Sequence, residues 1–249
     1  MAYQRAYFPV KTISLSQGYS SNSSSHKLSY ALDLAGVQDV FAPFDCIITK
    51  LYQPDNTKLH ANTVWLTSTK KVLSPNGYYG YLTISITHPS EIGTMKKGTK
   101  FKQGERICTT SKMTGNATGN HLHLEVAKGT IANWSKKVDG NYSEYVMTNS
   151  VKSEEYLFVR EDAVIKKDIY KGKKYNFVKE SDITYVVTEV PSEPLNVRSS
   201  TSLNSSKNII GGLTNGDEVI RFYSKGNMSY IYHYEIMGYV SNRYLKKKV

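Results

Sequence analysis

The sequence lacks the features that mark several large classes of protein. Its 249 residues include only two cysteines, Cys46 and Cys108, which are too few for a disulfide scaffold and predict buried free thiols. No apolar run approaches the roughly 20 residues that cross a bilayer, and the first basic residues are not followed by the apolar segment of a secretory signal. No stretch keeps a helical period. We therefore expect no membrane insertion and no helical bundle.

Acidic residues are also scarce relative to basic ones. The chain carries 32 basic and 21 acidic residues, a net charge of +11, and hydrophobic residues make up 39% of it. A basic surface attracts polyanions, so nucleic acid, anionic lipid and anionic wall polymers are all candidate partners. The basic residues are dispersed, without an arginine-rich patch or a nucleic-acid-binding motif, and we therefore expect no nucleic-acid partner.

What the chain has in quantity is short strand-like runs, separated by clusters of Asp, Asn, Gly and Pro. They predict an all-β protein with an antiparallel N-terminal domain (1–160), a basic, solvated linker (161–182) and a small C-terminal β-barrel (183–249). The runs lie at 28–34, 46–52, 63–67, 80–87, 106–109 and 121–127 in the first domain, and at 184–190, 208–213, 218–223, 230–234 and 237–240 in the second.

Polar and apolar residues alternate from His121 to Glu125, which predicts a half-buried strand. Leu122 and Leu124 would face a core, whereas His121, His123 and Glu125 would share the other face. Two imidazoles on one face can bind a metal ion, although two histidines on a solvent-facing strand are an equally reasonable interpretation. The decision depends on whether the chain supplies other ligands.

Other segments do offer such ligands. Asp33 lies in the predicted strand at 28–34 and His26 in or near the loop before it, so both could approach one point from the same edge. With one histidine of the pair they supply two nitrogens and a carboxylate oxygen, the donor set of a catalytic zinc site. His88 ends a run in which Leu82, Ile84 and Ile86 share a face. By alternation it would point the same way, where a lone histidine is more often a hydrogen-bonded core residue than a catalyst.

These residues carry a resemblance to the lysostaphin-like (LytM-type) zinc endopeptidases, which cut peptide bonds in bacterial peptidoglycan. The matching pieces span about residues 17–127. They are His26 to Asp33 followed by Leu-Ala-Gly, Ala42-Pro43, Lys97-Gly98, Gly104-Glu-Arg-Ile, Thr114-Gly115, and Thr118-Gly119-Asn120-His121-Leu122-His123-Leu124-Glu125. The last piece is specific, and the others alone would be weak.

The resemblance implies a role for each residue. His26, Asp33 and His123 would bind Zn²⁺, while His121 and His88 would act as base and transition-state stabiliser. Tyr19 resembles a loop tyrosine that helps to hold the oxyanion. Six residues separate His26 from Asp33, which is longer than the commoner family spacing, and Glu125 is expected to support the site rather than to bind the metal. His60 and His233 have no motif around them and are expected to be ordinary surface histidines.

The C-terminal region resembles a bacterial SH3 domain over about residues 184–246, through Leu195-Asn-Val-Arg198 and Met237-Gly-Tyr-Val240 with Arg243-Tyr-Leu245. Tyr230 stands where a tryptophan is frequent. Such domains tether enzymes to cell-wall peptides and so raise the local substrate concentration. The sequence does not separate ligand-contacting tyrosines from core tyrosines, and Lys246–Lys248 are interpreted as a solvated tail.

Together these observations predict a monomeric zinc-dependent peptidoglycan endopeptidase. The lack of a signal peptide suggests a phage endolysin that stays in the host cytoplasm until it is released to the wall. The alternatives are a bacterial autolysin, a non-catalytic wall-binding or hydrolase-activating protein of the same fold, and a basic polyanion-binding protein with an incidental histidine pair. The peptide bond that is cut has no signature in the sequence.

Overall fold

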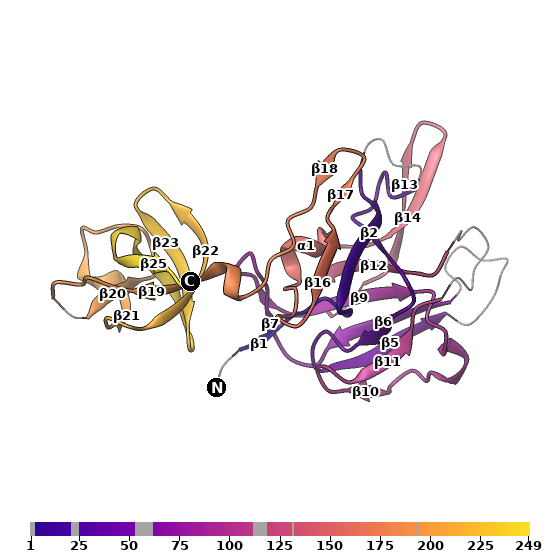
Figure 1. Cartoon of the computed structure of the whole chain (residues 1–249), viewed down its shortest axis with the longest axis horizontal. Helices are drawn as coiled ribbons and strands as arrows, with labels where there is room; N and C mark the ends of the chain where they lie inside the picture. Colours follow the sequence, from indigo (N-terminus) through magenta and orange to yellow (C-terminus); the bar gives the residue numbers. More distant parts are fainter. Residues whose placement is uncertain (1–2, 21–24, 53–61, 112–118, 131, 193) are drawn as a thin grey trace. The chain divides into compact units, whose positions relative to one another are not determined.

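The computed structural model describes residues 3–20, 25–52, 62–111, 119–130, 132–192 and 194–249 (Figure 1). Strands dominate this part of the chain, and the α-helix within it, α1 (Ser153–Tyr156), is a single turn. The predicted all-β class is therefore confirmed. The chain forms two compact units: residues 4–74 with 79–177, and residues 178–249 with Tyr3 and residues 75–78. No helix among the described residues is long and apolar enough to span a membrane.

A nine-stranded sheet organises the first unit. Its main path runs β10 (Lys100–Phe101), β5 (Cys46–Tyr52), β6 (Thr63–Ser68), β9 (Leu82–Thr87), β12 (His121–Lys128), β3 (Leu32–Ala35), β2 (Thr12–Gly18) and β16 (Val164–Lys167), and β15 (Ser150–Val151) pairs with β12. All these pairs are antiparallel except β16 with β2. The central strand β12 has β3 and β9 as its neighbours.

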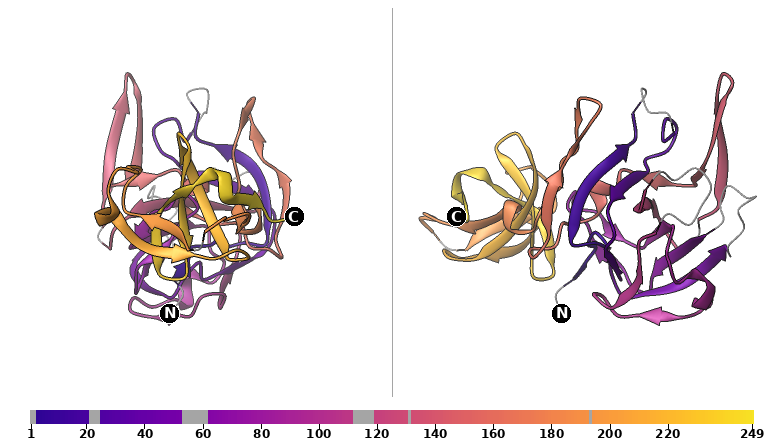
Figure 2. Two further views of the ribbon diagram at one scale, coloured as in Figure 1. Left: turned by 90° about the vertical axis from the view of Figure 1, so that its left-hand side faces the viewer. Right: turned by 45° about the vertical axis from the view of Figure 1, so that its right-hand side comes forward.

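Smaller pairings complete the first unit. They are β1 (Gln4–Arg5) with β7 (Val72–Leu73) and β8 (Tyr79–Gly80), β4 (Asp39–Phe41) with β11 (Arg106–Thr109), β13 (Trp134–Asp139) with β14 (Tyr142–Met147), and β17 (Ile169–Tyr170) with β18 (Lys173–Lys174). The β13–β14 hairpin extends well beyond the sheet (Figure 2).

The two faces of the large sheet differ in chemistry because side chains alternate along each strand. Leu122 and Leu124 of β12 are buried together with Ile84 and Ile86 of the adjacent β9. The opposite face of β12 carries His121, His123 and Glu125, as the alternation predicted. One face thus forms the core, and the other presents polar groups.

The predicted linker is wrong for residues 164–177, which belong to the first unit. Strand β16 pairs with the edge strand β2, so this segment extends the large sheet. Tyr175 is 1% exposed, and a Cβ at Gly18 would lie 2.4 Å from its hydroxyl, so glycine is required at that position. The segment contains few apolar residues, but two of them, Tyr175 and Phe177, are buried and hold it in place.

The second unit is a seven-stranded antiparallel sheet in the order β21 (Ile209–Leu213), β20 (Leu195–Arg198), β24 (Ile236–Ser241), β23 (Met228–His233), β22 (Glu218–Lys225), β19 (Thr184–Val187) and β25 (Leu245–Lys247). Its core contains Val187, Val197, Leu213, Ile231 and Val240. The predicted solvated tail is wrong in part, because Lys246 and Lys247 pair with β19 as part of β25.

Candidate metal centre

The register between β3 and β12 places Asp33 directly opposite His123. Opposed residues on neighbouring strands share a face, so the carboxylate and the imidazole meet without any loop being needed. The Nδ1 of His123 lies 3.0 Å from Oδ1 of Asp33. Sheet pairing alone therefore builds two thirds of the candidate ligand set.

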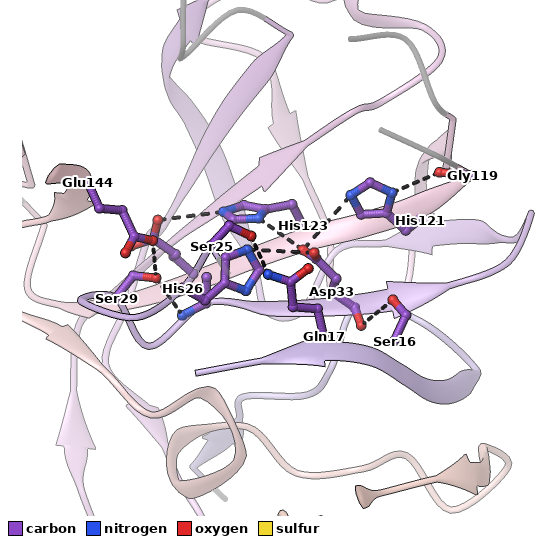
Figure 3. Close-up of polar contacts among 12 residues, drawn as sticks. Ser16, Gln17, Ser25, His26, Ser29, Asp33, Gly119, His121, His123 and Glu144 are labelled. Carbon is purple, nitrogen blue, oxygen red and sulfur yellow. Dashed lines mark hydrogen bonds and ion pairs between the residues drawn. The ribbon is translucent and has the colours of Figure 1, made fainter. Parts of the chain in front are cut away.

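His26 reaches the same point from outside the sheet. Its φ of +68° is uncommon for a residue with a side chain, and its imidazole is 4% exposed. The Nε2 of His26 lies 3.6 Å from Oδ2 of Asp33, and its ring lies 4.8 Å from that of His123 (Figure 3). His26 Nδ1 is buried and has no hydrogen-bond partner among the described residues. This ring is held in position with an unused nitrogen.

One donor atom from each of His26, Asp33 and His123 lies within 4.8 Å of the others, so the three residues could hold a metal ion. Tetrahedral zinc with ligands at about 2.0–2.2 Å needs donor atoms about 3.4 Å apart. His123 Nδ1 lies 3.0 Å from Oδ1 of Asp33, and His26 Nε2 lies 3.6 Å from its Oδ2, so each imidazole is near that distance from the carboxylate. Two imidazoles and one carboxylate are also the donor types that zinc prefers. The donor types therefore fit zinc, and the three donor atoms lie within 4.8 Å of one another.

Burial and neighbouring charge set the protonation of these residues. Burial lowers the pKa of His26 to about 4, so its ring is neutral near pH 7, as a metal ligand must be. Burial alone would raise the pKa of Asp33, but His26 and His123 lower it to about 2. Burial would lower the pKa of His123, but Asp33 and Glu125 raise it to about 10, and a metal ion would compete with that proton.

His121 lies beside the ligand group on the same strand face. Its Nδ1 is 2.9 Å from the carbonyl oxygen of Gly119, which can only accept a hydrogen bond, so Nδ1 carries the proton. The other nitrogen, Nε2, lies 3.9 Å from Oδ1 of Asp33. In the neutral ring, Nε2 is an unprotonated nitrogen that faces the ligands.

His88 completes the group from the loop after β9. Its ring centroid lies 4.6 Å from that of His121, and burial together with His121 lowers its pKa to about 3. The alternation that placed its side chain on the face of Ile84 and Ile86 is wrong, because β9 ends at Thr87 and the φ of His88 is +71°. This turn moves the ring to the polar face, where the resemblance had put it.

The structure does not bring Tyr19 into this group. Its hydroxyl donates to Oε1 of Glu154, its ring packs edge-on against Tyr30 and Tyr175, and Lys173 Nζ lies 3.4 Å from its ring centroid. The pKa of Tyr19 is raised above its ordinary value by burial and by Glu154. Tyr19 therefore helps to hold the segment at 173–175 against the unit, and none of its contacts is with a candidate ligand.

Other sequence predictions have mixed outcomes. Glu125 is buried, with Oε1 3.6 Å from Nε2 of His123, which fits the supporting role predicted for it. His233 contacts the carbonyl oxygen of Glu218 in the second unit. Cys46 and Cys108 are free and buried, as predicted. His60, Thr114-Gly115 and Thr118 lie outside the described residues.

Sequence reasoning missed Glu144. Its carboxylate accepts hydrogen bonds from Leu28 N and Ser29 Oγ, immediately after His26. Nothing near Glu144 in the sequence marks it, because its partners lie more than a hundred positions earlier. No local signal could have found it.

No family model matches the chain, but individual proteins are similar to parts or most of it. Morphogenesis protein 1 of Bacillus phage B103 is 35% identical over 140 residues, which cover 55% of this chain, and the chain spans 36% of the length of that relative. Among solved structures, lysostaphin of Staphylococcus simulans is similar over 97% of this chain and 92% of its own, at 15% identity and a TM-score of 0.41. A zinc-containing peptidase from Vibrio cholerae is similar over 51% of this chain and 36% of its own, at 19% identity and a TM-score of 0.36.

Proposed function

We propose that this protein is a zinc-dependent endopeptidase that hydrolyses a peptide bond in bacterial peptidoglycan. The observation that carries the proposal is the convergence of His26, Asp33 and His123 on one point, with His121 and His88 beside them. Three protein ligands leave a coordination position open, as in catalytic rather than structural zinc sites. The resemblance of the same residues to lysostaphin-like peptidases supplies the substrate class.

The flanking histidines have ring nitrogens that suit hydrolysis. Zinc, when bound, supplies Lewis-acid polarisation of a carbonyl group and makes a nearby water more acidic. The Nδ1–H of His121 donates a hydrogen bond to the carbonyl oxygen of Gly119, which leaves Nε2 free to accept a proton. His121 can later give this proton to the leaving amine. His88 is neutral near pH 7 and can donate one hydrogen bond to an oxygen that gains negative charge.

A turbidity assay on purified Gram-positive walls tests the function. The wild type should clear the suspension, and a chelator or His123→Ala should abolish clearing, while added Zn²⁺ should restore only the chelated wild type. His233→Ala in the second unit is the matched control and should clear walls normally. Clearing that survives both the chelator and His123→Ala would refute the zinc mechanism. Mass spectrometry of the released fragments would identify the bond.

The second unit is the wall-binding part in this proposal, through its resemblance to bacterial SH3 domains. Tyr223, Tyr230 and Tyr239 lie opposite one another on β22, β23 and β24, with ring centroids 5.3 Å and 5.0 Å apart along the row. Tyr223 is 44% exposed. Exposed tyrosines give a flat, partly polar contact surface. Tyr223→Ala should reduce the amount of protein that sediments with walls without changing the rate at which a soluble peptide is hydrolysed. An equal loss of wall binding and of peptide hydrolysis would argue against a separate tether.

The biological setting proposed is phage-induced lysis, with the enzyme held in the host cytoplasm until its release. The similarity to a protein of a Bacillus phage supports a phage origin. Because that relative is called a morphogenesis protein, a second candidate is a wall peptidase that is part of the phage particle. Immunoblots of purified particles and of the lysate separate the two: an endolysin is found in the lysate alone.

A further inference from the structure

The β13–β14 hairpin contacts the residues that support both histidine ligands. Lys137 of β13 and Glu144 of β14 are cross-strand partners, so their side chains lie on the same face of the hairpin. Both reach the turn that follows His26. Figure 3 shows the carboxylate of Glu144 directed at this turn, next to Ser29.

This pair satisfies both backbone polar groups of Leu28. Glu144 Oε2 accepts from Leu28 N at 2.9 Å, and Lys137 Nζ donates to Leu28 O at 3.1 Å. The second carboxylate oxygen, Oε1, accepts from Ser29 Oγ at 2.6 Å. Charge-assisted hydrogen bonds of this kind are stronger than those between neutral groups. The turn is thus bound to the hairpin by side chains rather than by strand pairing.

We call the contacts of Glu144 and Lys137 with Leu28 and Ser29 the clamp, and Lys27 makes further contacts with the hairpin beside it. Lys27 Nζ lies 2.5 Å from Oδ2 of Asp139 at the end of β13, and 5.9 Å from the ring of Tyr142 on β14. Lys27 is the residue next to His26. The segment between the ligand and β3 is therefore fixed to the hairpin at three successive residues, from Lys27 to Ser29.

The clamp adds to the burial of Ala31 and the packing of Tyr30 on Tyr19, because no strand pairing holds this turn. His26 has a positive φ, and β3 begins only at Leu32, so residues 27–31 form no strand pairing. A ligand on an unrestrained turn would lose conformational entropy each time a metal ion bound, which weakens affinity. Fixing the turn beforehand removes that cost.

The same hairpin also reaches the other histidine. The backbone N–H of Met147, at the end of β14, donates to Oε2 of Glu125 at 3.0 Å. Glu125 Oε1 lies 3.6 Å from Nε2 of His123, the nitrogen remote from Asp33. One strand therefore holds the supports of both imidazoles, His26 through Glu144 and His123 through Glu125.

We propose that the β13–β14 hairpin is a brace that sets the separation of His26 and His123, with Glu144 as its main positioning residue. The inference rests on the proposed metal site and adds to it a determinant of metal affinity outside the ligands. Groups that hydrogen-bond directly to metal ligands typically change metal affinity by about 10- to 100-fold when they are replaced. Glu144 acts on the backbone and Ser29 next to a ligand, so we expect the lower end of that range.

Titration of the purified full-length chain with Co²⁺, and with Zn²⁺ against a chromophoric chelator, tests the brace. Glu144→Gln keeps the side-chain size but presents an amide N–H₂ to groups that donate. It should weaken binding of both ions by about 10-fold and alter the visible absorption of bound Co²⁺. Glu155→Gln is the matched control, since this carboxylate on α1 pairs with Lys152, the residue before the helix. It should leave affinity and spectrum unchanged.

Two further variants separate positioning from general destabilisation. Ser29→Ala removes one hydrogen bond to Glu144 and should weaken metal binding less than Glu144→Gln does. The double variant should bind no more weakly than Glu144→Gln alone, because Ser29 acts through Glu144. Additive losses that follow the thermal stability of the metal-free chain would overturn the proposal.

The outcomes also separate the brace from the proposed function. A wild type that binds Co²⁺ and clears walls, with Glu144→Gln equal to it in affinity and spectrum, would refute the brace alone. A wild type that binds neither Co²⁺ nor Zn²⁺ would refute the zinc mechanism and the brace with it.

Discussion

The candidate centre combines two kinds of support, a sheet and a pair of turns, and they position side chains differently. Asp33 and His123 face each other because β3 and β12 pair in register, and His121 lies two residues along the same face. His26 and His88 lie outside the strands, and both have positive φ values. The sheet positions its residues through many backbone hydrogen bonds, whereas each turn depends on a few specific contacts.

Both supports contribute proposed ligands and one proposed catalytic histidine, and Asp33 is a further ligand on the sheet. The strand carries His123 and His121, and the turns carry His26 and His88. Backbone conformations of the kind found at His26 and His88 cost about 1–3 kcal/mol each and persist only where the surroundings impose them. Their occurrence at two residues of one cluster indicates that the position of these rings matters more than the local strain.

The largest expected effect tests what decides the result of replacing a histidine: its chemical role, or its location on the strand or on a turn. His121→Ala and His88→Ala should retain metal and lose about 10²- to 10⁴-fold in activity, as is usual when a general base or a donor to a developing oxyanion is removed. His26→Ala and His123→Ala should lose the metal itself, because a ligand is missing. Metal content and the rate of peptide hydrolysis, measured on the same preparations, check this. If the two strand histidines behaved alike and differed from the two turn histidines, the assigned roles would be wrong.

The next effect concerns the sheet itself. Leu122 is 1% exposed on the face opposite the histidines, so Leu122→Ala leaves a cavity and should lower the free energy of unfolding by about 2–5 kcal/mol. Denaturant unfolding of the metal-free chain measures this loss. Leu203→Ala, where the side chain is 66% exposed, is the control and should change stability by less than about 0.5 kcal/mol. A loss at Leu122 no greater than that of the control would show that the sheet is not the rigid support described here.

The same contrast explains which parts of the site could be predicted from sequence. The alternation from His121 to Glu125 specified the faces of β12, because strand geometry is local and has a period of two. The run at 28–34 was predicted as one strand, yet β3 begins at Leu32. The preceding turn is hydrogen-bonded to Glu144 and Lys137, which are distant in sequence, and no local pattern contains that information.

The predictions for the orientation of His88 and for the segment at 164–177 were wrong for related reasons. The periodic row from Leu82 to Ile86 is real, but a positive φ at His88 ends it, and single-residue backbone reversals leave no periodic trace. The segment at 164–177 has the composition of a linker, but the environment of Tyr175 and Phe177, not their number, decides whether they are buried. Tyr19 matched a motif by its position in the sequence, but its hydroxyl donates a hydrogen bond to Glu154 rather than to a candidate ligand.

The smallest expected effect compares Asp33 with a carboxylate that anchors a loop without touching the candidate ligands. Burial alone would raise the pKa of Asp45, but the backbone N–H of Gln103 and the charge of Lys70 contribute to lowering it to about 2. Because the folded pKa is below the unfolded value of about 3.9, Asp45 stabilises the fold fully above pH 4, and this contribution is lost as the pH falls toward 2. Asp45→Asn should therefore flatten the dependence of the unfolding free energy on pH between about 4 and 2, measured by denaturant titration, and leave metal affinity at pH 7 unchanged. A fall in metal affinity at pH 7 in this variant would mean that loops remote from the turns also position the ligands, and the distinction between sheet and turn supports would then lose its basis.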